Sequence, residues 1–366
     1  MITADLDQEL AAALRALAAR DLLPVPSAQL SPAGTWRPGP DGDPASYATA
    51  APFQIAGLAG LHPAQAAAEV AGSLRSVPWI EAATPSGEGY LTVTVTHQAL
   101  AASAARMAAA GQACANSAIL RGTAATSRPW PDLATARSWQ HAWQLQADAM
   151  TSHLARAAGA AATDLSERER VNTGTRRSRT TRPGVDDPGV DDAVAYLGPD
   201  SVRYRLARTM PGHRLRPASL GMASITAARA PMADPLYPVQ QAHAAAASAL
   251  RWAADLGLEP AGITDGLGRQ LRSPAELALL GLLSFLPVRV AAAARRGRPD
   301  EIPRYLEQVS AVWLTCRLQV PALPFGGQAA PRDPGQAGAR LVLARAVAAA
   351  IAAGLALTGI AARDRL

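Results

Sequence analysis

Lysine is absent from this sequence of 366 residues, so all 35 side chains counted as lysine or arginine are arginine. The planar guanidinium donates two hydrogen bonds at once, which suits phosphate groups. The net charge of +6 and a pI near 10.0 fit a polyanionic partner. A coding bias towards arginine, alanine, glycine and proline would produce the same excess, so composition alone leaves both explanations open.

Cysteine and aromatic residues are also scarce. The two cysteines, Cys114 and Cys316, lie far apart and have no neighbouring His or Cys at ligand spacing. This argues against a zinc site and against a disulfide framework. The apolar run 341–362 contains Arg345, and its bulky residues fall on one helical stripe, which favours a bundle helix over a membrane span. The N-terminus has no basic signal region, so we expect a cytoplasmic protein.

Hydrophobic periodicity predicts an α+β domain over residues 1–100. Leucines at helical spacing indicate a helix over 5–23, and further helices are expected around 47–58 and from Pro63. Threonines alternate with apolar residues over 90–96, which predicts a half-buried strand.

The rest of the chain is predicted to be mainly helical. Residues 101–189 are expected to form a degenerate connector, disordered around 166–185, where arginine and small polar residues dominate. Residues 190–366 are predicted to be a helical region, with Asp191 or Asp192 capping its first helix and an all-α bundle from about 237. Trp252 and Trp313 lie among Leu and Ala and are predicted to be core residues.

Several segments follow the order found in one family. They are Ala45-Ser-Tyr-Ala-Thr-Ala-Ala-Pro-Phe-Gln-Ile-Ala56, Gly89-Tyr-Leu-Thr-Val93, the run 190–204, Leu236-Tyr-Pro-Val-Gln-Gln-Ala-His243, and the runs 304–313 and 339–343. Together they resemble arginyl-tRNA synthetases, in the N-terminal additional domain and the DALR-type anticodon-binding domain. In that family the first domain contacts the tRNA elbow and D-loop, and the second contacts the anticodon.

The resemblance also shows departures at RNA-contacting positions. The family pattern over 238–245 would read Tyr-Val-Gln-Tyr-Ala-His-x-Arg, and its tyrosines and arginine touch the anticodon. The chain keeps Val239, Gln240, Ala242 and His243, but Pro238, Gln241 and Ala245 replace the contacting residues. In the N-terminal domain, Ala50 replaces an Asn associated with the elbow contact.

The ATP-binding signatures of the family have no good counterpart. Asp132 and Thr135 occupy the histidine places of the His-x-Gly-His signature, and a carboxylate would repel a triphosphate. The best echo of the Lys-Met-Ser-Lys signature is Arg177-Ser-Arg179. The intervening residues 133–178 are too few for a doubly wound nucleotide-binding sheet. We therefore expect no catalytic residue, no cofactor and no metal, and no aminoacylation by the chain alone.

The resemblance implies a non-catalytic paralogue that binds tRNA or other structured RNA, without DNA specificity and without a membrane. The candidate RNA-binding residues are Phe53, Gln54, Arg203, Arg205, Arg208, Tyr237, Gln240 and His243. A solvated helix face is the alternative for each arginine, and helix packing is the alternative for His243.

Two other functions stay open. The first is a protein-interaction or regulatory module that no longer binds RNA, because the contacting residues of the anticodon motif are replaced. The second is arginine–tRNA ligase activity with ATP that depends on a partner, for example a full-length synthetase. A continuous band of arginines on the fold would favour RNA, and scattered arginines would favour a protein partner.

Overall fold

The computed structural model describes residues 2–19, 36–163, 189–210, 230–262, 266–324 and 333–366, and a few positions between 215 and 228. The expected disorder around 166–185 lies outside these residues. The chain divides into two compact units, each assembled from three segments. Unit 1 comprises Met1–Cys114, Ala246–Val288 and Val312–Ala349, and unit 2 comprises Ala115–Ala245, Arg289–Ala311 and Ala350–Leu366.

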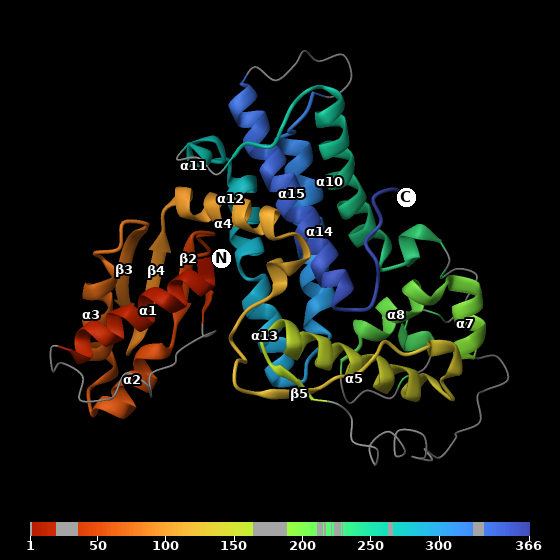
Figure 1. Ribbon diagram of the computed structural model, residues 1–366, viewed down its shortest axis with the longest axis horizontal. Helices are drawn as coiled ribbons and strands as arrows, with labels where there is room; N and C mark the ends of the chain where they lie inside the picture. The colour runs from red at the N-terminus through yellow and green to blue at the C-terminus, as the bar shows by residue number, and fades with distance from the viewer. Residues whose placement is uncertain are drawn as a thin grey trace. The chain divides into compact units, whose positions relative to one another are not determined.

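The N-terminal part of unit 1 is the predicted α+β domain (Figure 1). Its antiparallel sheet has the order β1-β2-β4-β3, and helices α1, α2 and α3 accompany it. The bounds are α1 Ile2–Ala18, β1 Arg37–Pro38, β2 Ser46–Thr49, α2 Ala51–Ala59, α3 Pro63–Leu74, β3 Ile80–Ser86 and β4 Tyr90–Val95. The expected strand over 90–96 and the helix opening at Pro63 are confirmed.

The prediction of a helix from Tyr47 is wrong for its first residues. Tyr47 is fully buried in β2 and pairs with Val93 of β4, so tertiary pairing overrides the local helical preference. Helix α2 begins only at Ala51, with a proline in its first turn. The Thr49 hydroxyl accepts a hydrogen bond from the Ala51 amide at 3.1 Å, which marks the change from strand to helix.

Unit 1 joins this α+β domain to helices from the second half of the chain. Helix α4 (His97–Ala110) packs against α11 (Leu267–Gln270) and α12 (Pro274–Ser284). The buried Tyr47 hydroxyl lies 2.8 Å from the Ser284 hydroxyl. At Gly281 a Cβ would lie 2.5 Å from the Pro44 carbonyl oxygen, so this approach requires glycine. The two segments therefore share one core.

Unit 2 contains a small parallel sheet and several helices. Its elements are β5 Ala124–Thr126, α5 Trp139–Ala157, β6 Ala161–Thr163, α7 Val190–Leu197 and α8 Pro199–Ala207. A buried cluster that includes Leu133, Val202 and Met222 holds α5, α7 and α8 together. Helix α7 begins one residue before Asp191, so neither aspartate is its N-cap. Instead, the Asp192 carboxylate accepts a hydrogen bond from the Gly189 amide at 3.3 Å.

Four long helices pass from one unit into the other along the chain: α10 (Tyr237–Asp255), α13 (Leu286–Arg296), α14 (Glu301–Gln319) and α15 (Pro334–Ala356). Among the described residues, α15 alone is a single helix long and apolar enough to span a membrane, but 67% of its apolar window is buried in the protein. The predicted single stripe is wrong, because α15 is buried on nearly all sides. Away from its ends, Arg345 is its exposed residue.

Candidate nucleic-acid interface

Helix α10 carries the motif that resembles an anticodon-contacting sequence, and its two sides differ. The matching residues face inward: Val239 and Ala242 are fully buried, and Gln240 and His243 are 3% and 6% exposed. The replaced positions face outward, since Pro238 and Gln241 are exposed and Ala245 is half-buried. The residues that match the family pattern therefore pack inside the protein, and the residues that differ from the pattern lie on the outer side of α10.

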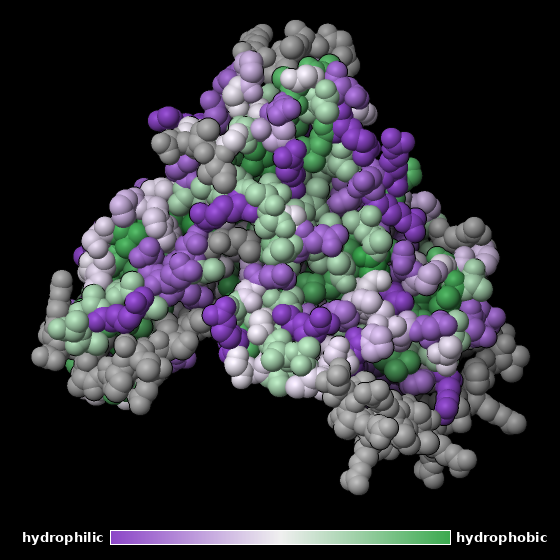
Figure 2. Space-filling model, in the orientation of Figure 1, coloured by the Kyte–Doolittle hydropathy of each residue, from purple (hydrophilic) through white to green (hydrophobic). Residues whose placement is uncertain are grey.

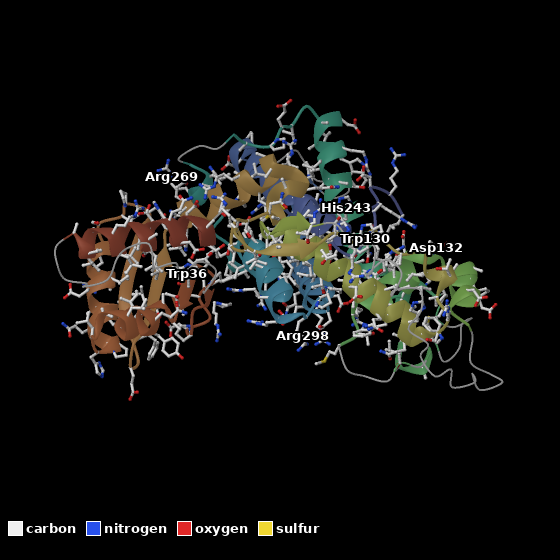
Figure 3. All side chains as sticks on the ribbon, turned by 60° about the horizontal axis from the view of Figure 1, so that its bottom comes forward. Trp36, Trp130, Asp132, His243, Arg269 and Arg298 are labelled. Carbon is white, nitrogen blue, oxygen red and sulfur yellow. The ribbon has the colours of Figure 1, made fainter. Side chains whose placement is uncertain are left out.

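Gln240 and His243 hold the C-terminal segment against α10. The Gln240 amide nitrogen donates to the Ala361 carbonyl at 2.9 Å, and its oxygen accepts from the Arg363 amide at 2.8 Å. His243 Nδ1 lies 3.0 Å from the Arg363 carbonyl oxygen, a contact in which Nδ1 carries the proton. Both residues were expected to touch RNA. The structure corrects this expectation, because their polar groups are used within the chain. Figure 3 marks His243 on α10.

Arg205 is also corrected from an RNA contact to a structural residue. Its side chain is 3% exposed, and its guanidinium donates to the carbonyls of Leu220, Ala228 and Ala233 at 3.0, 3.2 and 2.9 Å. Asp234 lies 3.9 Å away. Burial lowers the pKa of Arg205, and Asp234 partly offsets this effect. An RNA phosphate cannot reach a guanidinium enclosed in this way.

Arg203 and Arg208 differ in how accessible they are. Arg203 donates to the Gln146 side chain and to the Pro131 carbonyl, both at 3.1 Å, and it lies 5.9 Å from the centre of the Trp130 ring. Burial lowers the pKa of Arg203. Arg208 is 43% exposed but forms an ion pair with Glu307 at 2.5 Å. Of the three candidate arginines, only Arg208 is accessible to a ligand, and its charge is already paired with the Glu307 carboxylate.

Phe53, Gln54 and Tyr237 keep accessible surface. Phe53 is 38% exposed on α2 and forms an edge-to-face pair with Tyr90, which is 49% exposed, at 5.1 Å between ring centres. Gln54 is exposed beside it, and Tyr237 is half-buried at the start of α10. Sequence reasoning missed Tyr90 as a partner of Phe53, because the strand alternation gave no sign that the two rings meet.

Trp252 is a second surface aromatic that the sequence misplaced. Trp313 is 4% exposed, as predicted for a core residue, but Trp252 on α10 is 58% exposed. Leu256, four residues later, is 60% exposed. The alanine-rich surroundings suggested burial at both positions, and only the packing of the helices distinguishes them.

The segment that echoes the first ATP-binding signature has a structural role here. The Asp132 carboxylate accepts from the Ala134 amide at 3.1 Å and so caps the short turn 133–135. Trp130, which is labelled in Figure 3, stacks on His153 at 4.3 Å between ring centres. Burial is the main cause that lowers the pKa of His153. The echo of the second signature, Arg177 to Arg179, lies outside the described residues.

Neither cysteine is placed for ligation. Both are buried and free, and burial raises the pKa of the Cys114 thiol to about 12 and that of Cys316 to about 11. In the described part of the chain, no group of three or more His, Cys, Asp or Glu side chains is arranged to hold a metal ion. On the face shown in Figure 2, hydrophilic residues lie in small scattered groups rather than in one continuous band.

With this geometry established, comparison with known proteins identifies the C-terminal part. Residues 239–366 match the DALR anticodon binding domain. The match begins inside α10, so the matched region contains Gln240, His243 and Trp252, and it ends with the C-terminal segment that bonds to Gln240.

The chain is similar to arginine–tRNA ligases over about half of its length. It is 36% identical over 177 residues to the arginine–tRNA ligase of Frankia alni, which covers 48% of this chain and 30% of the ligase. It is 31% identical over 198 residues to that of Nitratidesulfovibrio vulgaris, covering 54% and 34%. The matches thus span about a third of these relatives.

The Thermus thermophilus arginyl-tRNA synthetase structure aligns with 63% of this chain and 40% of that chain, at 24% identity and a TM-score of 0.35.

Proposed function

We propose that this protein is a non-catalytic relative of arginyl-tRNA synthetases that binds tRNA or another structured RNA in the cytoplasm. The observation that carries the proposal is the DALR domain over 239–366, whose helix α10 keeps its outward positions exposed. The net charge of +6 is compatible with a polyanionic ligand. We propose no cofactor and no metal for this function.

The RNA surfaces we propose are narrower than those expected from the sequence. They comprise the aromatic pair Phe53 and Tyr90 with Gln54 on the α+β domain, and the exposed positions at the start of α10 around Tyr237. Arg208 is retained as an accessible cation. Arg203, Arg205, Gln240 and His243 are assigned to packing, because their polar groups bond within the chain.

The test is binding of total cellular tRNA to the purified protein across a series of salt concentrations. We expect an affinity that falls with salt, with a slope of roughly 0.9 per phosphate contacted. Many described arginines are exposed, among them Arg121, Arg156 and Arg269, so the slope measures how many of them contact phosphate groups. An inert acidic polymer of similar charge density serves as the control. Equal affinity for tRNA and this polymer near physiological salt would reject RNA binding.

The second candidate is a protein-interaction or regulatory module. It is favoured by the internal use of the Arg203–Arg208 tract and by the loss of both tyrosines and the arginine of the family pattern. A full-length synthetase is one partner to test by co-purification. Incubation with ATP, arginine and tRNA, alone and beside such a synthetase, tests the third candidate, ligase activity that depends on a partner.

A further inference from the structure

Trp252 is an exposed aromatic residue near the capped C-terminal end of helix α10. It is 58% exposed, although a tryptophan side chain is among those that gain most from burial. Leu256 lies four residues later and is 60% exposed, so the two side chains are neighbours on the same exposed side of the helix end. Neighbouring exposed apolar groups can mark a binding surface, whereas single ones are ordinary.

The end of α10 holds Trp252 in a defined place. Gly257 adopts a φ of +68° and ends the helix. The Leu258 amide donates to the Ala253 carbonyl at 2.8 Å, and the Gly257 amide donates to the Ala254 carbonyl at 3.0 Å. This is the glycine-terminated turn that fixes many helix ends. The ring is therefore presented from a rigid scaffold, which lowers the entropy cost of stacking on it.

The charges near Trp252 favour an uncharged ligand over a phosphate. The ring lies in the last turn of α10, where the helix dipole is negative, and the exposed Asp255 adds a negative charge. Arg251 is half-buried and donates to the Ser248 hydroxyl at 2.7 Å on its own helix. A flat, neutral aromatic group fits this surface, and a nucleobase unpaired in an RNA loop is such a group.

We propose that Trp252 is a stacking platform for one unpaired base of the RNA bound by the DALR domain. The proposal rests on the proposed function and extends it by naming a residue and the group it recognises. The site lies on the helix that has lost the aromatic residues of the family pattern, so it supplies an aromatic surface from a different position. It contributes to loop recognition and makes no phosphate contact.

The experiment compares two RNAs and three variants by fluorescence anisotropy. The RNAs are a hairpin with an unpaired loop and a fully paired duplex of the same length. The variants are Trp252→Ala, Trp252→Phe and the control Tyr196→Ala, which removes an exposed aromatic ring on α7. Because both positions are exposed, thermal melting should show unchanged folding.

We expect the wild type to prefer the hairpin, and Trp252→Ala to lose at least about fivefold in hairpin affinity, the lower end for one stacked base. Duplex affinity and the salt slope should stay unchanged, because no phosphate contact is removed. Trp252→Phe should retain most of the preference, and Tyr196→Ala should retain all of it.

A hairpin preference that survives Trp252→Ala, or a wild type that binds RNA without preferring the loop, would overturn the stacking assignment. Loss of affinity for both RNAs with a shallower salt slope would also overturn it, because that pattern indicates a phosphate contact. A wild type that binds both RNAs no better than an inert polyanion would instead refute the proposed function.

Discussion

Replacement of Arg205 by methionine should separate a structural arginine from an RNA contact. The substitution keeps an unbranched side chain of similar length and removes the guanidinium. Three backbone carbonyls, those of Leu220, Ala228 and Ala233, then lose their charged donor in the interior of unit 2. Asp234 loses its partner at 3.9 Å.

The expected loss follows from these contacts. Hydrogen bonds from charged groups contribute roughly 1.5–3 kcal/mol each, and removing one member of a buried charged cluster costs about 3–5 kcal/mol in total. We expect a loss of about 4 kcal/mol in the free energy of unfolding of unit 2. For a unit of this size each kcal/mol lowers Tm by roughly 2–4 °C, so Tm should fall by about 8–16 °C.

Circular dichroism during heating and during urea titration measures this loss. Arg208→Met is the matched control, because Arg208 is 43% exposed and its pair with Glu307 should contribute less than about 1 kcal/mol. RNA affinity per folded molecule should be unchanged in Arg205→Met. A Tm close to that of the wild type, together with weaker RNA binding, would refute the structural role.

Three further predictions test other contacts. Gly281→Ala should destabilise unit 1 by about 1–3 kcal/mol, because the new Cβ would meet the Pro44 backbone. Gly72→Ala, which has open space around it in α3, should stabilise unit 1 by roughly 0.5–1 kcal/mol. Equal changes in Tm for the two variants would contradict this prediction. Cys114 and Cys316 should resist iodoacetamide at pH 8 unless urea is added, and fast labelling of the native protein would argue against their burial. Burial raises their thiol pKa values from 9.0 to about 12 and 11. The stability that these shifts contribute is present below pH 9 and is lost as the pH rises through the folded-state pKa values. Gln240→Ala should speed hydrogen exchange at the Arg363 amide, whose acceptor is removed, and unchanged exchange there would mean that the C-terminal segment is held by other contacts.

The fold class followed from sequence because its signals are local. The threonine alternation over 90–95 and the proline at 63 each act within a few residues, and β4 and α3 are where they were expected. Tyr47 was misassigned because its conformation is decided by pairing with Val93, which lies far along the chain. Local preference carries no information about such a partner.

The site was harder to predict, because side chains of the same type have different roles. Arg203, Arg205 and Arg208 look alike in sequence, but helix α8 directs Arg205 into a group of carbonyls and Arg208 towards Glu307. In α10, the residues that match the family pattern are the buried ones. Their similarity to the family therefore reflects helix packing and gives no information about RNA contacts. The exposure of Trp252 depends on which helices cover α10, and the alanine-rich sequence does not specify this.

The hydrogen bonds that join distant segments also set the order in which the chain can fold. Thr3 bonds to the Ser284 carbonyl, 281 positions away, and Gln146 bonds to that of Thr358, 212 positions away. Each unit also combines three separate segments. A nascent chain on the ribosome therefore cannot complete unit 1 when residue 114 emerges, and it must wait for α12 and much of α15. Contacts between such distant segments slow folding, and apolar surface stays exposed to solvent until they form. We expect the yield of folded protein to depend on chaperones and on the rate of synthesis.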